Sequence, residues 1–456
     1  MAHIAIIGAG LGGLPTAYEL RHLLPPHHQI TLISDSPTFT FIPSLPWVAL
    51  GFKPLESIQL SLEACLHPLG IQWICGKVTA IEPQVQRVSV GEQTLNYDYL
   101  AIATGVELAL DALPGLGPDS GYSQSVCNPP HALAARRAWQ QFLQKPGPLV
   151  VGAVPGASCL GPAYEFALLA DYQLRKLGLR DAVPITFITP EPYVGHLGIG
   201  EMANSAELVS QAMVKRGIEA IANTAITALE RDSRSVRAAS PPENPCGNRI
   251  HLSNGRSLPF SYTMLLPPFR GPQFLKAVPK LTDSNGFIPV LPTHQHPHYD
   301  SIYAVGTIVQ LSPADRTPLP LGVPKTGQMT EAMAMAVAHN IAIALNELDA
   351  QPVTPTLTAT CFADFGNTGI LFVADPVLPD PLTGKRRQAK AFQGPWVSWS
   401  KTAFEQYFLA KMRWGSAVPW FERLGLQLFG LSLVEPLPPA LLEIPFQKFQ
   451  QHSAPK

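Results

Sequence analysis

The stretch that decides the fold reads IAIIGAGLGG and occupies residues 4–13. Its first four residues are apolar and predict a buried strand, and its last six form a glycine-rich turn before a helical pattern over residues 14–24. A second apolar run, residues 30–33, completes a βαβ unit. Glycines at this junction permit a tight turn, the approach of a pyrophosphate and close packing of helix on strand. We therefore expect a dinucleotide at the N-terminus of this helix, held by Gly8, Gly10, Gly12 and Gly13.

The residue that would hold a ribose hydroxyl is not settled by the pattern. Units of this kind carry an acid after the second strand, and here Ser34 and Asp35 follow the run 30–33. Either side chain can accept the hydrogen bond, so both are candidate cofactor ligands.

Two later segments belong to the same unit. Residues 97–105, YDYLAIATG, form a strand that ends in Ala-Thr-Gly, a pattern typical of flavoproteins with two dinucleotide-binding domains. Residues 301–306, SIYAVG, resemble the late FAD strand of that class, although Thr307 stands where an aspartate is usual. We expect Thr104, Gly105 and Gly306 at the cofactor. Elements so far apart predict a discontinuous FAD-binding domain, 1–112 and 287–357, with a second domain, 113–286, inserted.

The inserted domain has a glycine turn of its own, but a degenerate one. An apolar strand, residues 149–151, runs into GAVPGA at residues 152–157. Val154 takes the place of the middle glycine and Pro155 follows it, which obstructs the close approach of a backbone to a pyrophosphate. NADH is therefore disfavoured as the electron donor.

Composition excludes some partners. The chain has 456 residues and a formal net charge of -1, so it offers no electrostatic reason to bind nucleic acid. Only 14% of its residues are charged, against about 25% in soluble domains, which indicates either a thick core or an apolar surface. We expect no transmembrane helix, because no run of about 18 consecutive apolar residues is present. We also expect no secretory signal, because the N-terminus lacks a basic region.

The six cysteines form no CxxC pair and no zinc-ligand spacing, so no metal site is expected. Cys65 and Cys75 are expected to be core thiols, and Cys246 an incidental thiol in the surface loop or hairpin over residues 232–254.

Several segments together resemble the sulfide:quinone oxidoreductase family. They are SVCN at 125–128, GASCLGPAYE at 156–165, EPYVGHLG at 191–198, CFADFG at 361–366 and KTAFEQYF at 401–408. With the N-terminal glycine motif, the resemblance runs nearly from end to end.

The resemblance implies a redox pair made of Cys159 and Cys361. Sulfide would attack a sulfur of their disulfide or bridging polysulfide, which turns a two-electron transfer into thiol exchange. Cys127 matches the third family cysteine, which either attaches the flavin covalently or handles the growing sulfur chain.

Three further polar residues match positions near the sulfide site: Glu165, His131 and His196. A histidine there can hold HS⁻ or relay protons, because its unperturbed pKa lies near neutrality. Glu165 would either stabilise a protonated partner or face solvent at the entry channel.

The negative charge of reduced flavin needs a partner. Residues 318–330 read as a turn that leads into a helix. Its N-terminus, at Lys325, Thr326 and Gly327, is expected to supply amide donors and a positive dipole to the flavin.

The C-terminal region, residues 358–456, is expected to bind quinone and membrane. Two helices, 397–412 and 419–433, combine aromatic and leucine side chains with cations, which suits a helix lying among lipid headgroups. A helical pair that only covers the core would look similar. Aromatic residues that match the family's quinone pocket, where stacking would hold a flat head group, are Phe362, Phe392 and Tyr407.

The resemblance therefore implies an α/β fold with two Rossmann-like dinucleotide-binding domains, one for FAD and one degenerate, plus a membrane-associating C-terminal region. It implies oxidation of sulfide to polysulfide or elemental sulfur, with FAD as cofactor and a membrane quinone as acceptor, at a peripheral membrane protein. The membrane face and homo-oligomerisation stay open. The alternatives are a type II NADH:quinone oxidoreductase, the flavin subunit of a flavocytochrome c sulfide dehydrogenase, and a non-catalytic sulfur-sensing flavoprotein.

Overall fold

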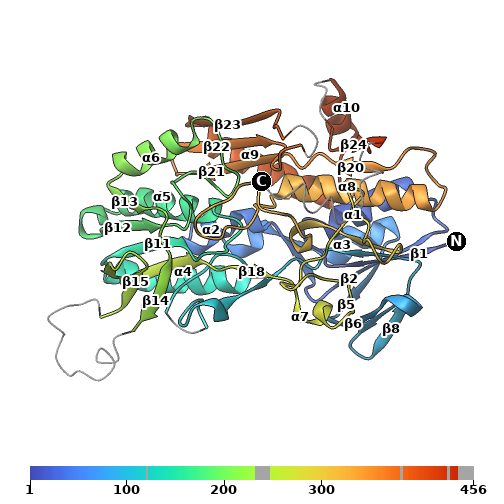
Figure 1. Ribbon diagram of the computed structural model, residues 1–456, viewed down its shortest axis with the longest axis horizontal. Coiled ribbons are helices and arrows are strands. Elements are labelled where there is room, and N and C mark those ends of the chain that lie inside the picture. Colours follow the sequence, from blue (N-terminus) through green and yellow to red (C-terminus); the bar gives the residue numbers. More distant parts are fainter. Residues whose placement is uncertain (120–121, 232–246, 381–383, 429–431, 440–456) are drawn as a thin grey trace.

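The computed structural model describes residues 1–119, 122–231, 247–380, 384–428 and 432–439 (Figure 1). Its three main layers are two parallel sheets with their helices and a smaller antiparallel sheet with a helical C-terminal region.

The first parallel sheet draws strands from both ends of the chain. Its order is β19-β9-β1-β2-β5, with β1 (His3–Ile7), β2 (Gln29–Ser34), β5 (Gln72–Cys75), β9 (Tyr99–Ile102) and β19 (Ile302–Ala304). The expected βαβ unit is present, since α1 (Gly13–Leu23) joins β1 to β2. Helix α8 (Gly327–Ala344) packs on α1, and most of its residues are buried, in keeping with its mainly apolar sequence.

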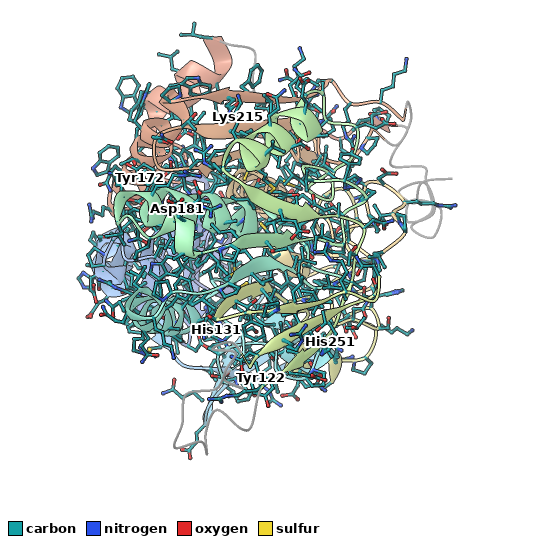
Figure 2. The ribbon with its side chains drawn as sticks, turned by 90° about the vertical axis from the view of Figure 1, so that its left-hand side faces the viewer. Tyr122, His131, Tyr172, Asp181, Lys215 and His251 are labelled. Atoms are coloured by element: carbon teal, nitrogen blue, oxygen red, sulfur yellow. The ribbon has the colours of Figure 1, made fainter. Side chains whose placement is uncertain are left out.

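The second parallel sheet has the order β13-β12-β11-β17. Its strands are β11 (Leu149–Ala153), β12 (Ile185–Ile188), β13 (Ile218–Ile221) and β17 (Tyr262–Leu266), and its helices are α4 (Pro129–Gln144), α5 (Gly161–Lys176) and α6 (Ser205–Lys215). Figure 2 turns the molecule towards this sheet and labels Lys215 on α6 and His131 on α4. The prediction of an α/β fold with a second dinucleotide-type unit is confirmed.

The antiparallel sheet β21-β22-β23 follows. It consists of β21 (Ala359–Asp364), β22 (Gly369–Asp375) and β23 (Gln388–Gly394). Helix α9 (Trp396–Arg413) packs on β21 and β22, and α10 (Trp420–Leu428) projects at the edge of the molecule (Figure 1).

Smaller elements complete the fold. The short antiparallel strands are β3 (Thr38–Thr40), β4 (Gln59–Ser61), β6 (Val78–Glu82), β7 (Arg87–Val90), β8 (Gln93–Asn96), β10 (Glu107–Leu108), β14 (Ile226–Glu230), β15 (Arg249–Leu252), β16 (Ser257–Pro259), β18 (Phe269–Arg270), β20 (Val353–Pro355) and β24 (Val434–Pro436). The short helices are α2 (Leu45–Ala49), α3 (Leu62–Leu66) and α7 (Gln273–Lys276).

Some local expectations need correction. The helix expected over 419–433 is shorter, because from Val434 the chain is strand β24, paired with β20; residues 429–431 lie outside the described part. Cys75 is exposed rather than in the core, because β5 is an edge strand, whereas Cys65 is buried. By contrast, the segment expected as a surface loop or hairpin over 232–254 includes strand β15, which pairs antiparallel with β14 in agreement with a hairpin. Residues 232–246, with Cys246, lie outside the described part. None of the described helices is long and apolar enough to cross a bilayer.

Candidate active site

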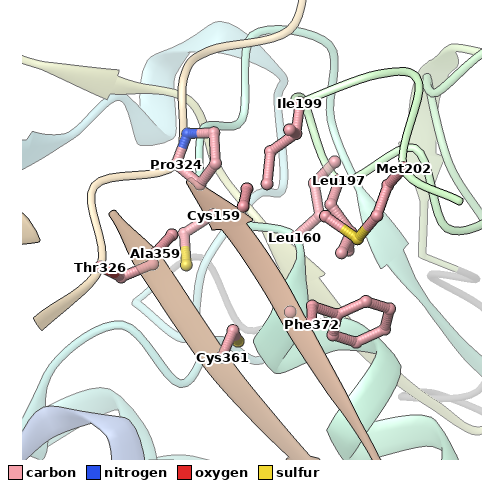
Figure 3. Close-up of a pocket in the computed structure, with 12 residues that line it drawn as sticks. Cys159, Leu160, Leu197, Ile199, Met202, Pro324, Thr326, Ala359, Cys361 and Phe372 are labelled. Atoms are coloured by element: carbon pink, nitrogen blue, oxygen red, sulfur yellow. The ribbon is translucent and has the colours of Figure 1, made fainter. Parts of the chain in front are cut away.

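Cys159 and Cys361 line the same small cavity, as Figure 3 shows. Cys159 lies in the turn between β11 and α5, and Cys361 lies on β21. The cavity holds about 30 Å³ and its walls are almost wholly apolar. They are formed by Cys159, Leu160, Gly161, Leu197, Ile199, Met202, Pro324, Thr326, Ala359, Cys361, Phe372 and Ala374.

A glycine lets the two cysteine-bearing elements meet. Helix α5 begins at Gly161, and a Cβ at this position would lie 3.4 Å from Cys361 Sγ. A Cβ would therefore just touch this sulfur, and a larger side chain at position 161 would crowd Cys361. Packing of α5 on β21 therefore brings together two residues that are far apart in the chain.

The apolar walls disfavour thiolates. Burial, helped by the neighbouring thiols of Cys361 and Cys127, raises the pKa of Cys159 to about 12. Burial raises the pKa of Cys361 to about 11, although Lys401 opposes the shift. The exchange chemistry in this cavity thus depends on an attacking group that arrives already ionised.

Glu165 forms a buried ion pair with Lys401 beside Cys361. The two side chains come from α5 and α9 and are each no more than 5% exposed. The Lys401 ammonium also lies 4.6 Å from the centre of the Trp47 ring, whose Nε1 donates to Asp364 at 3.0 Å. Burial raises the pKa of Glu165 to about 7 against the opposing effect of Lys401. Glu165 therefore stabilises a cationic partner, and the alternative of a solvent-facing carboxylate is wrong.

Cys127 and His131 are joined through Ser125. The Cys127 amide donates to Ser125 Oγ at 3.3 Å, and His131 Nδ1 lies 3.2 Å from the same oxygen. Asn128 caps α4 by accepting the His131 amide at 2.9 Å. Burial raises the pKa of Cys127 to about 11 and lowers that of His131. Neither residue is among the described residues that line the cavity, although Cys127 is close enough to influence Cys159.

His196 is buried, and it is not among the described residues that line the cavity. Its Nε2 lies 3.3 Å from Asp315, and its Nδ1 accepts the Gly198 amide at 3.2 Å. The proton of the neutral ring is therefore on Nε2, directed at Asp315. Burial lowers the pKa of His196, and the hydrogen bond and charge of Asp315 partly offset this shift.

The first glycine turn fits a dinucleotide. A Cβ on Gly8 would lie 2.2 Å from the Ala103 carbonyl oxygen, and a Cβ on Gly13 would lie 1.8 Å from that of Gly8. These two positions pack against protein, whereas a Cβ on Gly10 would meet nothing within 4 Å. The turn thus holds helix and strand together and leaves open space above Gly10, where a pyrophosphate would sit.

The other predicted cofactor residues lie around this turn. Gly105 and Gly306 both have positive φ, and a Cβ on Gly105 would lie 3.7 Å from the side chain of Thr307. Ser34 Oγ accepts the Ser36 amide at 3.2 Å. Asp35, by contrast, is exposed and makes no side-chain hydrogen bond within the described part of the chain. The remaining predicted residues are Gly12, which precedes α1, and Thr104, at the end of β9.

The N-terminus of α8 lies between the glycine turn and the cavity. Thr326 caps this helix by accepting the Met329 amide at 3.3 Å, and it also lines the cavity. A Cβ on Gly327 would lie 3.6 Å from Leu11 in the glycine turn. Lys325 donates to the Thr307 carbonyl at 2.9 Å, and burial lowers its pKa to about 7. These residues fit a flavin that reaches from the turn towards the two cysteines.

The second glycine turn is covered by the chain itself. The Gly156 amide donates to the Pro320 carbonyl at 2.7 Å, and the Gly322 amide donates to that of Ala157 at 3.1 Å. Val154 is buried. Backbone groups that would face a second dinucleotide are thus engaged internally, in agreement with the degenerate motif.

The predicted quinone residues do not all come together. Phe362 follows Cys361 on β21 and therefore points to the opposite face of the sheet. There its ring lies 5.8 Å from that of Phe404 on α9. Phe392 is 46% exposed on the edge strand β23, and the Tyr407 hydroxyl donates to Glu422 at 2.5 Å.

Sequence reasoning missed Phe404 and the pairing of Lys401. Phe404 and Phe408 are spaced to share one helix face, and this was the available signal. The cations of the helix predicted over residues 397–412 include Lys401 and Lys411. Both are buried in ion pairs, with Glu165 and Glu331, instead of lying among lipid headgroups. Trp414, Trp420 and Leu428, in the same region, are exposed.

One cluster in the described chain has metal-ligand chemistry: His27, His28 and Glu347. His28 Nδ1 accepts the Ala2 amide at 3.2 Å, so Nε2 carries the proton and donates to Glu347 at 2.9 Å. The nitrogen that would face an ion is therefore protonated in the neutral ring.

Comparison with known proteins places these features in context. Residues 2–336 match the model of the pyridine nucleotide-disulphide oxidoreductase family. The chain is 40% identical to the sulfide-quinone reductase of Aquifex aeolicus over 94% of its own length and 95% of that protein. The solved structure of the Aquifex aeolicus sulfide:quinone oxidoreductase matches with a TM-score of 0.86 at 39% identity, over 95% of this chain and 97% of that one. The mitochondrial sulfide:quinone oxidoreductase of Dictyostelium discoideum is 25% identical over 79% of this chain and 77% of that protein.

Proposed function

We infer that this chain, which belongs to the sulfide-quinone reductase family of pyridine nucleotide-disulphide oxidoreductases, oxidises sulfide and reduces a quinone. The observation that carries the proposal is the cavity shared by Cys159 and Cys361 beside the N-terminus of α8. Two thiols on separate elements, next to a dinucleotide turn, support a disulfide exchange coupled to a flavin.

In the proposed sulfur step, HS⁻ attacks Cys159 Sγ in the oxidised pair. A new S–S bond forms on Cys159, the Cys159–Cys361 bond breaks, and Cys361 leaves with the electron pair as a thiolate. The positive charge of Lys401 stabilises that thiolate, because it lowers the pKa of Cys361 against the effect of burial. HS⁻ is already ionised near neutral pH, so the reaction does not require a buried thiol to lose its proton first.

FAD would be held by the first glycine turn, by Asp35 or Ser34, and by the amides at the start of α8. When bound, it supplies a two-electron carrier between the thiol pair and the quinone. The overall reaction balances as HS⁻ + quinone + H⁺ giving S⁰ + quinol, and the sulfur accumulates as polysulfide. We propose Cys127 as a third thiol of this site; a covalent bond to FAD would keep the flavin on the denatured chain.

For the acceptor we propose the aromatic patch of Phe362 and Phe404. These rings lie on the face of β21 opposite Cys361, so sulfur and quinone would be handled on different sides of one strand. The exposed side chains of Trp414, Trp420 and Leu428 support peripheral attachment to a membrane surface. In this scheme residues 1–112 and 287–357 hold FAD, 113–286 carry Cys127 and Cys159, and 358–456 serve quinone and membrane.

The test is quinone reduction by the purified FAD-loaded enzyme without oxygen, with sulfide or NADH as donor. We expect turnover with sulfide and none with NADH, because the second glycine turn is covered. Cys159→Ser and Cys361→Ser should each abolish sulfide turnover yet retain FAD, whereas Cys75→Ser, at an exposed thiol, should behave as the native enzyme. Turnover with NADH alone, or an active Cys361→Ser enzyme, would contradict the proposal.

A further inference from the structure

Glu191 is fully buried, yet the proposed reaction does not use it. It follows β12, the second strand of the inserted βαβ unit. A dinucleotide-binding unit carries its ribose-binding acid after that strand. Here the carboxylate is directed into the protein, so it is unavailable to a nucleotide and must serve another purpose.

Three donors converge on this carboxylate. Glu191 Oε1 accepts the Leu197 amide at 2.6 Å, and Oε2 accepts the hydroxyls of Tyr164 at 2.5 Å and Thr189 at 2.6 Å. The Tyr164 hydroxyl in turn accepts the Gly195 amide at 2.8 Å. Burial raises the pKa of Glu191 to about 7, and these hydrogen bonds oppose the shift. The side chain thus ties two backbone amides of one loop to α5 and β12.

That loop, residues 193–204, is one wall of the cavity and is called the pocket loop below. Leu197, Ile199 and Met202 line the cavity together with the two cysteines, as Figure 3 shows. The backbone of the loop is strained, since Leu197, Glu201 and Asn204 all have positive φ although none is glycine. Such conformations persist only where surrounding contacts impose them. The hydrogen bonds through Glu191 and Tyr164 fix Leu197 and Gly195 in this wall. Further along the loop, Arg386 donates to the carbonyls of Ile199 and Gly200.

Because the cavity is small, the hydrogen bonds that fix the pocket loop also affect which guests the cavity can hold. A single water molecule needs about 10–15 Å³ of such space, so a cavity of about 30 Å³ holds only a small guest. A longer sulfur chain fits only if a wall moves. The opposite wall is the sheet that carries Cys361, whereas the pocket loop forms neither a helix nor a strand.

We propose that Glu191 is a positioning residue which, through Leu197 and Tyr164, fixes the pocket loop and so limits how many sulfur atoms the cysteine cavity holds before release. The inference rests on the proposed sulfide oxidation for the identity of the guest. Access to the cavity, however, is a property of the protein that can be measured without any turnover.

The experiment compares three variants of the FAD-loaded enzyme. Glu191→Ala removes all three acceptor contacts, and Tyr164→Phe removes the hydroxyl that holds Gly195. Thr189→Val is the matched control, because it takes one hydrogen bond from the same carboxylate without touching the pocket loop. The cysteines are reduced with dithiothreitol without oxygen, and the alkylation of Cys159 and Cys361 by iodoacetamide and by the bulkier N-phenylmaleimide is followed by mass spectrometry.

We compare the alkylation rate with N-phenylmaleimide to the rate with iodoacetamide. We expect this ratio to rise at least about tenfold in Glu191→Ala and Tyr164→Phe, and to equal that of the native enzyme in Thr189→Val. A tenfold change corresponds to about 1.4 kcal/mol. If Glu191→Ala does not fold, Tyr164→Phe against Thr189→Val decides. An unchanged ratio in the folded loop variants, or an equal rise in Thr189→Val, would overturn the proposal. Inactivity with sulfide would instead count against the proposed function and leave this ratio interpretable.

Discussion

Replacing Lys401 with methionine removes the cation from the buried pair beside Cys361. Methionine keeps most of the apolar stem, so the main loss is the charge that faces Glu165. With Lys401 present, burial already raises the pKa of Glu165 to about 7, well above its ordinary value of 4.5. Without it, the pKa of Glu165 rises further, because the carboxylate is left buried with no cation beside it.

The sign and size of the effect follow from proton linkage. Below about pH 7 Glu165 is protonated in the folded state of both proteins. Its titration therefore causes no difference between their free energies of unfolding. Above that pH the native carboxyl ionises, while the variant keeps a proton that its unfolded chain has released. The variant therefore loses about 1.4 kcal/mol of stability per pH unit relative to the native enzyme. The deficit is about 1.4 kcal/mol at pH 8 and about 3 at pH 9, approaching the 3–5 kcal/mol typical of a broken buried pair.

Urea unfolding at pH 6, 7, 8 and 9 and constant ionic strength, followed by tryptophan fluorescence, measures this difference. The double variant Glu165→Gln with Lys401→Met is the control and should show no growth of the deficit with pH. A deficit of constant size from pH 6 to pH 9, or one that grows equally in the double variant, would refute the assignment of the effect to Glu165.

Two further substitutions test the cofactor and acceptor sites. Gly10→Val fills the open space above the first turn without meeting protein, so we expect a folded chain that purifies without FAD; a native ratio of flavin to protein would show that the turn does not hold the cofactor. Phe404→Ala removes a stacking ring worth about 0.5–1.5 kcal/mol, so the KM for quinone should rise about 2- to 12-fold. Flavin reduction by sulfide should be unchanged, and Trp399→Ala, at an exposed ring on the same helix, should leave the KM native.

Local sequence was sufficient wherever the deciding contacts are local. Gly8, Gly10 and Gly13 predicted a dinucleotide turn because the tight turn and the strand-to-helix packing involve neighbouring residues. Val154 and Pro155 predicted the degenerate second turn for the same reason. The resemblance carried by short cysteine-containing segments pointed to Cys159 and Cys361, and the structure places both on one cavity.

Properties that depend on packing between distant segments could not be predicted from local sequence. Glu165 and Lys401 each look like an ordinary surface charge, and only the packing of both α5 and α9 on β21 removes them from water. The ring of Phe404 on α9 contacts that of Phe362 on β21, so the contact cannot be read from either segment alone. Cys75 is exposed because β5 is the last strand of its sheet.

The sequence alone therefore determined the α/β fold and the dinucleotide turn, because strand periodicity and glycine turns are encoded over a few consecutive residues. Its family resemblance pointed to Cys159 and Cys361 as the candidate reactive thiols. Tertiary structure decided which charges are buried in pairs, which aromatic rings meet and where Glu191 points. Burial and the geometry of a cavity are set by segments that meet only after folding, and no single segment contains them.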